Sequence, residues 1–302
     1  MFNNLTKRNT KKIILILYGG IGNQLFSYAA VKRLAKINNA KLIVDNKSGF
    51  INDKYKRQYQ LNHFSIKART ANYFERLEPF GRFARFFLKF INRFIKFDNK
   101  FYIVQNDMNF DSRLLTFNIK KLLFIEGYWQ SENYFKDIES HIREEFLIKS
   151  PSDSLNTSIS KSISNKVSVA VHVRFFDDKR GQTSNICDED YYLRAIKFIN
   201  KNVQGAHFFI FSDNPELVKS FISLPEDCMT FIDHNNEDNA YADLWLITKC
   251  QHFITANSTF SWWGAWLCEH VNKIVIVPKK SISNGEGAWG FDGLIPDEWN
   301  RL

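Results

Sequence analysis

Four stretches in the second half of the chain place hydroxyl, amide or charged side chains directly after an apolar run. These side chains belong to Arg174 and Asp177, Ser212 and Asp213, Asp233 and His234, and Asn257, Ser258 and Thr259. A guanidinium such as that of Arg174 can bind a diphosphate through two parallel hydrogen bonds. Hydroxyls at the start of a helix, such as those of Ser258 and Thr259, favour an anion because the helix dipole adds positive potential there. Together, these residues predict a site for a phosphate-bearing ligand.

The same residues also have a simpler, structural interpretation. Arg174 could form a salt bridge with Asp177 or Asp178, and Ser258 and Thr259 could do no more than cap a helix. A single polar strand end would not separate the two interpretations. Four in succession, one of them with an arginine, favour the ligand site.

Two motifs near these residues favour structural roles. Trp262 and Trp266 stand at positions i and i+4, so packing in the core explains them without a ligand. The D-x-D motif from Asp188 to Asp190 could hold a metal for a nucleotide sugar, but it lies where a helix is predicted to begin near Tyr191. Acids at that position are favoured by the helix dipole. We therefore expect a helix cap there, and no metal.

Strands and helices alternate through the second half, which predicts βαβ units and a parallel sheet. Ligands of such sheets bind beyond the carboxyl ends of the strands, where the four polar stretches lie. The predicted strands are residues 167–173, 207–211, 230–232, 252–256 and 274–277, and the predicted helices are residues 191–200, 216–222, 243–249 and 261–268.

The first half begins with a comparable unit. Residues 13–17 form an apolar run typical of a buried parallel strand, and a helix is predicted from about residue 25 to residue 37. Glycines in the connecting Y-G-G-I-G-N-Q let the backbone approach a ligand closely. The next predicted strand, 41–45, ends in an acid, as in dinucleotide-binding proteins, but Leu25 replaces the third glycine of that fingerprint.

A polar, serine-rich segment at residues 149–165 separates the two halves. It follows an apolar strand at 122–125, the sequence E-G-Y-W-Q-S-E-N-Y-F and a helix to about residue 146. Such segments mark domain boundaries, so we expect an N-terminal domain at 1–155 and a C-terminal domain at 160–302. The fold class predicted is α/β with two Rossmann-like domains.

Residues 80–97 predict a basic amphipathic helix. Its phenylalanines and isoleucines fall on one half of the helix and its cations on the other. Such a helix can lie on an anionic membrane with the phenylalanines down, or it can pack those rings into the protein with its cations in water. Both interpretations stay open.

Composition and charge narrow the classes of ligand. The chain has 302 residues, a formal net charge of +9 and 29 phenylalanines, which suggest an acidic ligand, an anionic surface, or both. Nucleic acid is not expected, because no zinc-finger, RNP-type or helix-turn-helix pattern occurs. The four cysteines form no C-x-x-C pair and predict buried, reduced thiols. The first apolar run is too short for a signal peptide or a membrane span, which predicts a cytoplasmic protein, with peripheral binding at the inner membrane face left open.

Five motifs, in order over nearly the whole chain, resemble glycosyltransferase family 11, the α-1,2-fucosyltransferases. They are G-G-I-G-N-Q-L-F-S-Y-A at 19–29, G-Y-W-Q-S-E-N-Y-F at 127–135, V-H-V-R at 171–174, F-I-F-S-D-N-P at 209–215 and A-N-S-T-F-S-W-W-G-A-W-L at 256–267. The resemblance implies a GT-B fold, with two Rossmann-like domains facing each other across a cleft, the N-terminal one on the acceptor side. It also implies GDP-fucose as donor, no metal, and inverting transfer to the 2-hydroxyl of a galactoside.

The resemblance further implies roles for individual residues. Arg174 matches the arginine at the donor β-phosphate, and Ser258 and Thr259 match contacts to the diphosphate. Asp243 occupies the place where related fucosyltransferases have an aspartate that pairs with guanine, whose two adjacent N–H donors a carboxylate can accept; alternatively, it caps its helix. The other donor-binding positions are Gly22, Asn23 and His172.

One departure from the family pattern concerns the segment from His172 to Asp177. The family usually reads H-x-R-R-x-D there, whereas this chain reads H-V-R-F-F-D and lacks the second arginine and the usual glycine. Asp177 is the candidate general base of an inverting reaction, with Glu126, Asp178 and His172 as alternatives. Two rival functions stay open: a transferase for another GDP-sugar or linkage, and a non-catalytic nucleotide-binding protein. The acceptor is expected to be an oligosaccharide or a lipid-linked glycan, as in O-antigen or other surface-polysaccharide synthesis.

Overall fold

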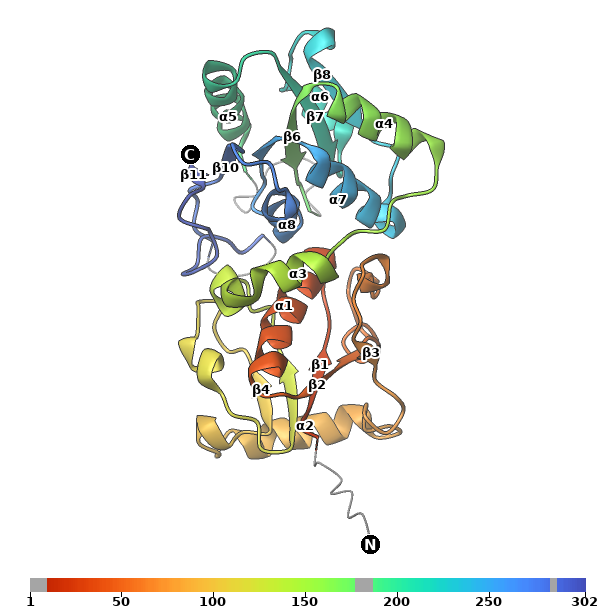
Figure 1. Cartoon of the computed structure of the whole chain (residues 1–302), viewed down its shortest axis with the longest axis vertical. Helices are drawn as coiled ribbons and strands as arrows, with labels where there is room; N and C mark the ends of the chain where they lie inside the picture. The colour runs from red at the N-terminus through yellow and green to blue at the C-terminus, as the bar shows by residue number, and fades with distance from the viewer. Residues whose placement is uncertain (1–9, 177–186, 283–286) are drawn as a thin grey trace, which may run out of the picture. The chain divides into compact units, whose positions relative to one another are not determined.

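The computed structural model describes residues 10–176, 187–282 and 287–302. Contacts within the chain divide it into two compact units, both α/β (Figure 1). The first holds the described residues up to Asn62 together with Ile66–Glu145, and the second holds His63–Ser65 and Phe146–Leu302. The predicted α/β class with two Rossmann-like domains is confirmed. No helix in the described ranges is both long and apolar enough to cross a membrane.

The first unit is built on a parallel sheet. Its elements are β1 (Lys12–Ile16), α1 (Ile21–Ile37), β2 (Lys41–Asp45), β3 (Arg69–Thr70), α2 (Gly81–Asn92), β4 (Tyr102–Val104), β5 (Leu122–Glu126) and α3 (Glu139–Glu145). The strand order is β3-β2-β1-β5-β4, and every pair is parallel. Leu88 of α2 packs against the cluster that contains Ile14 and Ile16, so α2 covers one face of this sheet.

The second unit is a six-stranded parallel sheet with helices around it. Its elements are α4 (Ser154–Ser164), β6 (Val167–Val173), α5 (Glu189–Asn202), β7 (Ala206–Ser212), α6 (Pro215–Lys219), β8 (Met229–Ile232), α7 (Ala240–Lys249), β9 (His252–Ile254), α8 (Thr259–Leu267), β10 (Val275–Val277) and β11 (Asn300–Arg301). The strand order is β11-β10-β9-β6-β7-β8. The alternation predicted from the sequence is therefore observed, with bounds that differ by a few residues.

The segment expected to separate the domains is structured. Residues 154–164 form α4, and the Asp153 carboxylate caps this helix by accepting a hydrogen bond from the backbone amide of Asn156 at 2.8 Å. Ile163 of the helix is fully buried. The contacts place α4 in the second unit, and the chain passes between units after Glu145, before the expected boundary at 155–160. The serine-rich composition had predicted a linker here, whereas the segment contains a short capped helix.

The tryptophans of α8 lie in the core, as predicted. Trp262 and Trp263 are fully buried and Trp266 is 4% exposed. The rings of Trp262 and Trp266 stack with centroids 6.1 Å apart, and the Trp262 indole donates to the Leu294 carbonyl at 2.8 Å. Together these contacts fix the position of α8.

Close packing of α8 on α7 predicts that Gly264→Ala destabilises the protein. A β-carbon at Gly264 would lie 2.3 Å from Cγ2 of the buried, branched Ile247. Although alanine favours a helix, we expect a net loss of about 1–3 kcal/mol in the free energy of unfolding, measured by urea denaturation. Gly20→Ala is the matched control, because Gly20 has φ −71° and nothing within 4 Å. A Gly264→Ala protein as stable as the parent would contradict this packing.

Candidate functional site

The second sheet has a topological switch point at β6. The chain runs outward from β6 through β7 and β8 on one side, and through β9, β10 and β11 on the other. Ligands of open parallel sheets bind at the carboxyl ends of the two strands that flank such a point. Arg174 directly follows β6, and Ser258 follows β9 before α8 begins. The two predicted diphosphate-binding segments therefore lie on adjacent strands.

Arg174 forms an ion pair with Asp213. Its Nη1 lies 3.2 Å from Asp213 Oδ2, and its side chain is 30% exposed. The register explains the pair, because Val173 lies opposite Ser212 in the parallel β6–β7 ladder. Burial raises the pKa of Asp213 above its usual range, although the charge of Arg174 acts in the opposite direction. Asp177, predicted as a partner, lies outside the described residues, as does Asp178, and sequence reasoning did not pair Arg174 with Asp213.

Phe176 lies in the segment H-V-R-F-F-D, where the sequence departs from the pattern of the family that it resembles. Its φ is 56°, a left-handed conformation that glycine adopts freely and that a side chain makes costly. Its ring lies 5.5 Å from the Arg174 guanidinium carbon. Phe175 is 5% exposed, and its amide donates to Asp213 Oδ1 at 2.9 Å. Both phenylalanines thus contribute to the surroundings of Arg174.

His172 is buried and uncharged. It is 7% exposed, and burial, followed by the charge of Arg174, lowers its pKa to about 3. Its ring lies 5.4 Å from that of Phe260 in the first turn of α8. Within the described part of the chain, His172 Nδ1 is buried without a hydrogen-bond partner. A group with this pKa is a poor general base near neutral pH.

Glu126, the other described alternative to Asp177 as general base, forms two hydrogen bonds. Glu126 Oε2 accepts a hydrogen bond from Lys89 Nζ at 2.6 Å, and its Oε1 accepts from the Tyr102 hydroxyl. Each carboxylate oxygen can accept two hydrogen bonds, so these contacts hold the Glu126 side chain in place and leave it able to accept another. Of the two described alternatives, His172 is therefore unsuited to that role, whereas Glu126 stays open.

Ser258 and Thr259 form the start of α8. Ser258 is the N-cap, and its Oγ accepts from the Phe260 amide at 3.3 Å. The buried Asn257 supports the turn by donating to the Gly287 carbonyl at 2.8 Å. Ser258 and Thr259 are both partly exposed. The capping interpretation is confirmed for Ser258, and its partial exposure leaves the hydroxyl accessible to an anion at the helix start.

Asp243 lies in the first turn of α7 and does not cap the helix, whose N-cap is Asn239. The alternative interpretation as a cap is therefore wrong. Burial raises the pKa of Asp243 to about 6, although Asn235 opposes this by donating to Oδ1 at 2.7 Å. Asn235 also donates to Asn156 Oδ1 at 3.1 Å. Sequence reasoning missed Asn235, although its position just after β8 and His234 was a usable signal.

Two motifs of the first unit meet at Asn23. Gln130 donates to Asn23 Oδ1 at 2.7 Å, and the Ser27 hydroxyl donates to the Gly127 carbonyl at 2.7 Å. The turn before α1 has its left-handed residue at Gly19, with φ 78°, while Gly22 is already helical and buried. The glycine-rich turn and the G-Y-W-Q segment are therefore joined by hydrogen bonds and lie side by side.

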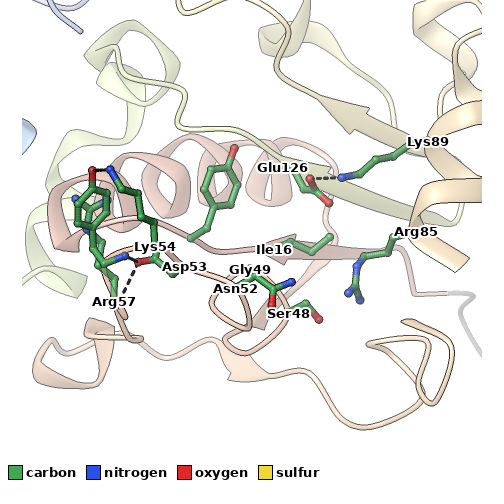
Figure 2. A pocket seen from close by; sticks show the side chains of 12 residues that line it. Ile16, Ser48, Gly49, Asn52, Asp53, Lys54, Arg57, Arg85, Lys89 and Glu126 are labelled. Carbon is green, nitrogen blue, oxygen red and sulfur yellow. Dashed lines mark hydrogen bonds and ion pairs between the residues drawn. The ribbon is translucent and has the colours of Figure 1, made fainter. Parts of the chain in front are cut away.

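A cavity of about 450 Å³ opens in the same unit (Figure 2). Figure 2 shows Lys89 joined to Glu126 at one end and Lys54, Asp53 and Arg57 at the other. Tyr18 also lines it and packs against Tyr128, with ring centroids 4.8 Å apart. The lining residues are Ile16, Tyr18, Ser48, Gly49, Asn52, Asp53, Lys54, Tyr55, Arg57, Arg85, Lys89 and Glu126.

The D-x-D motif forms a helix cap, as predicted. Asp188 is the N-cap of α5, and its Oδ1 accepts from the Tyr191 amide at 2.8 Å. Asp190, in the first turn, pairs with Arg194. Both acids therefore have structural partners.

Comparison with known proteins gives consistent matches. The family described as Glycosyl transferase family 11 matches residues 4–289. An α-1,2-colitosyltransferase of Escherichia coli is 28% identical over 96% of this chain and 98% of its own length. The O-antigen biosynthesis glycosyltransferase WbnK of Escherichia coli is 31% identical over 95% and 99%. Human galactoside α-(1,2)-fucosyltransferase 1 is 24% identical over 48% of this chain and 43% of its own length.

Two solved structures share the fold. FUT1 of Arabidopsis thaliana, determined in complex with GDP, gives a TM-score of 0.51 at 13% identity and covers 92% of this chain and 72% of its own. POFUT1 in complex with GDP-fucose gives 0.50 at 14% identity and covers 88% and 98%. The fold class is therefore GT-B, as the sequence motifs implied.

Proposed function

The chain belongs to glycosyl transferase family 11, and on that premise we propose that it transfers fucose from GDP-fucose to the 2-hydroxyl of a galactoside, with inversion. It is a glycosyltransferase of the 2-α-fucosyltransferase type. The observation that most directly supports the donor is the placement of Arg174 and the start of α8 on adjacent strands at the switch point. WbnK, named for O-antigen biosynthesis, supports a surface polysaccharide as the product.

The second unit would bind the donor. Arg174 and the start of α8 at Ser258 and Thr259 offer a guanidinium, a hydroxyl-bearing cap and a helix dipole to a diphosphate. The same positive groups would stabilise GDP as it departs, so we propose that the reaction needs no metal and that chelators leave turnover unchanged. Asp243 would accept the two N–H donors of guanine, and His172 would contact the donor through its buried ring.

The first unit would bind the acceptor, with Gly22 and Asn23 also contacting the donor. Its cavity presents aromatic rings, on which sugars stack, and both carboxylates and cations, which bind hydroxyls. We propose Asp177 as the general base rather than His172, which is too weak a base; Glu126, bound to Lys89 and Tyr102, is the second candidate. The proposed acceptor is an oligosaccharide or a lipid-linked glycan.

A second candidate donor comes from one relative. The colitosyltransferase of Escherichia coli is similar over almost the full length of both chains. Colitose differs from fucose by the absence of the 3-hydroxyl, so the phosphate and guanine contacts above would serve either donor. The phenylalanines beside Arg174 would then contribute to donor choice.

A donor-by-acceptor assay tests this function. We expect GDP release from GDP-fucose to require a β-galactoside acceptor, to persist in EDTA, and to yield an α-1,2 linkage by NMR. Turnover with GDP-colitose but not with GDP-fucose would identify colitose as the sugar transferred, and the reaction would still be glycosyl transfer. GDP binding without transfer to any acceptor would refute the transferase and support a non-catalytic nucleotide-binding protein.

A further inference from the structure

Phenylalanines are exposed along one face of α2 and at the residues that flank the helix. We call this face the phenylalanine surface; its residues are Phe80 (69% exposed), Phe83 (75%), Phe86 (72%), Phe87 (62%), Phe90 (50%) and Phe94 (78%). Positions 83, 86, 87, 90 and 94 share one side of a helix. The predicted alternative, in which these rings pack into the protein with the cations in water, is therefore wrong. Large exposed apolar surfaces mark interaction sites.

Polar contacts fix the helix in this orientation. Arg85 is 9% exposed and donates to a backbone carbonyl at 2.9 Å, and Lys89 donates to Glu126 at 2.6 Å. Asn92 is 3% exposed, and its Oδ1 accepts from the Tyr102 amide at 3.0 Å. Rotating α2 to bury its phenylalanines would break these three contacts and expose Leu88, which packs on the sheet. The phenylalanine surface is thus directed outward by the fold itself.

Charge along α2 and the turn that follows it has one sign, with acids only beyond its two ends, at Glu78 and Asp98. The stretch 81–97 contains five basic residues and no acid. Arg85 and Lys89 turn toward the protein, whereas Arg82, Arg93 and Lys96 are exposed beside the phenylalanines. Apolar rings flanked by cations match the boundary between the acyl chains and anionic headgroups of a bilayer.

We propose that the phenylalanine surface docks the protein on an anionic lipid bilayer, with α2 parallel to the membrane plane. The aromatic rings would enter the acyl boundary while Arg82, Arg93 and Lys96 contact anionic headgroups. A second copy of the chain fits less well, because a two-fold interface opposes the same patch to itself and would bring like charges together. This inference goes beyond the transferase activity and does not rest on it, since vesicle binding needs no substrate.

Vesicle sedimentation of the full chain tests the proposal. We expect binding to phosphatidylglycerol–phosphatidylcholine vesicles, weaker binding to pure phosphatidylcholine, and loss with rising salt. The triple variant Phe83→Ser, Phe87→Ser, Phe94→Ser should bind anionic vesicles at least roughly tenfold less tightly. Arg82→Gln and Arg93→Gln should each cost roughly fivefold.

The matched control is Leu155→Ser with Leu193→Ser, which removes exposed apolar side chains (50% and 47%) from helices of the other unit. This variant should bind vesicles like the parent, and GDP binding should be equal in all variants. Unchanged vesicle binding by the triple phenylalanine variant would overturn the proposal. The proposal would also be overturned if the parent protein did not bind vesicles but formed a dimer in sedimentation, and the triple variant did not form this dimer. The phenylalanine surface would then be covered by a second copy of the chain.

Discussion

Replacing Arg174 by alanine is expected to lower turnover by roughly 10³-fold, because the departing diphosphate would lose the guanidinium that stabilises it in the proposed reaction. The loss should fall mainly on kcat, measured as GDP release with saturating donor and acceptor. Activity within a few-fold of the parent would refute a role for Arg174 at the phosphate.

Folding must be separated from chemistry in this experiment, because Arg174→Ala leaves Asp213 without its cationic partner. The Asp213 side chain is 19% exposed and would lose its cationic partner, so we expect the single variant to lose stability in urea denaturation. Adding Asp213→Asn should restore the denaturation midpoint, because the amide oxygen can still accept from Phe175. Turnover should stay low in the double variant. A double variant that regains activity would show that Arg174 serves only to neutralise Asp213.

Asp177→Asn examines the proposed base separately. If Asp177 takes the proton, the variant should bind GDP normally and lose turnover. Turnover close to that of the parent would remove Asp177 from the role.

Asp243→Asn is expected to weaken GDP binding by roughly 10- to 100-fold, in line with other bidentate contacts to a base. The amide would present a donor to one of the two guanine N–H groups. Selectivity for GDP over ADP should fall as well, which titration calorimetry with both nucleotides would measure. Asp238→Asn is the matched control, because Asp238 is an exposed acid just before the same helix. Equal GDP affinity in the parent and Asp243→Asn would leave Asp243 with a structural role only.

The pKa of Asp243 adds a pH dependence with a definite sign. Burial raises this pKa to about 6, so the carboxyl is ionised above that pH and protonated below it. In the proposed pairing, guanine would bind the ionised form, so GDP affinity should be constant near pH 8 and fall as the pH drops through 6. With GDP-fucose as the probe, whose esterified diphosphate lacks the terminal phosphate group that titrates at about pH 6 in GDP, Asp243→Asn should lack this dependence. An affinity that rises as the pH falls would contradict the assignment.

Local signals were sufficient for much of the fold. The strand at residues 41–45 and the strand at 167–173 have the predicted bounds, because apolar runs of this kind are typical of buried parallel strands. Asp188 was recognised as a helix cap because acids favour a helix start. These features depend on residues within one or two turns of each other, which a single sequence records.

Features that depend on distant partners could not be predicted. The sequence of α2 separates an aromatic half from a basic half, but only the positions of Glu126 and the Tyr102 amide decide which half faces the protein. The Arg174–Asp213 pair likewise follows from the register of β6 and β7, which is known once Val173 and Ser212 are seen opposite each other. The many phenylalanines of α2 indicated from the sequence that the helix could bind a surface. Which half of the helix faces the protein could be seen only in the structure.

The register between β6 and β9 limits how the proposed donor site can change. Val171 lies opposite Ile254, and this pairing determines how far Arg174 and Ser258 lie apart along the sheet. A slip of one residue would change that separation by about 3.3 Å and turn every side chain to the other face. In the proposed donor site, the spacing offered to a diphosphate would thus be set in whole-residue steps by backbone hydrogen bonds. On this proposal, substitutions at Phe175 and Phe176 would change the sugar that is selected while the diphosphate spacing stays the same.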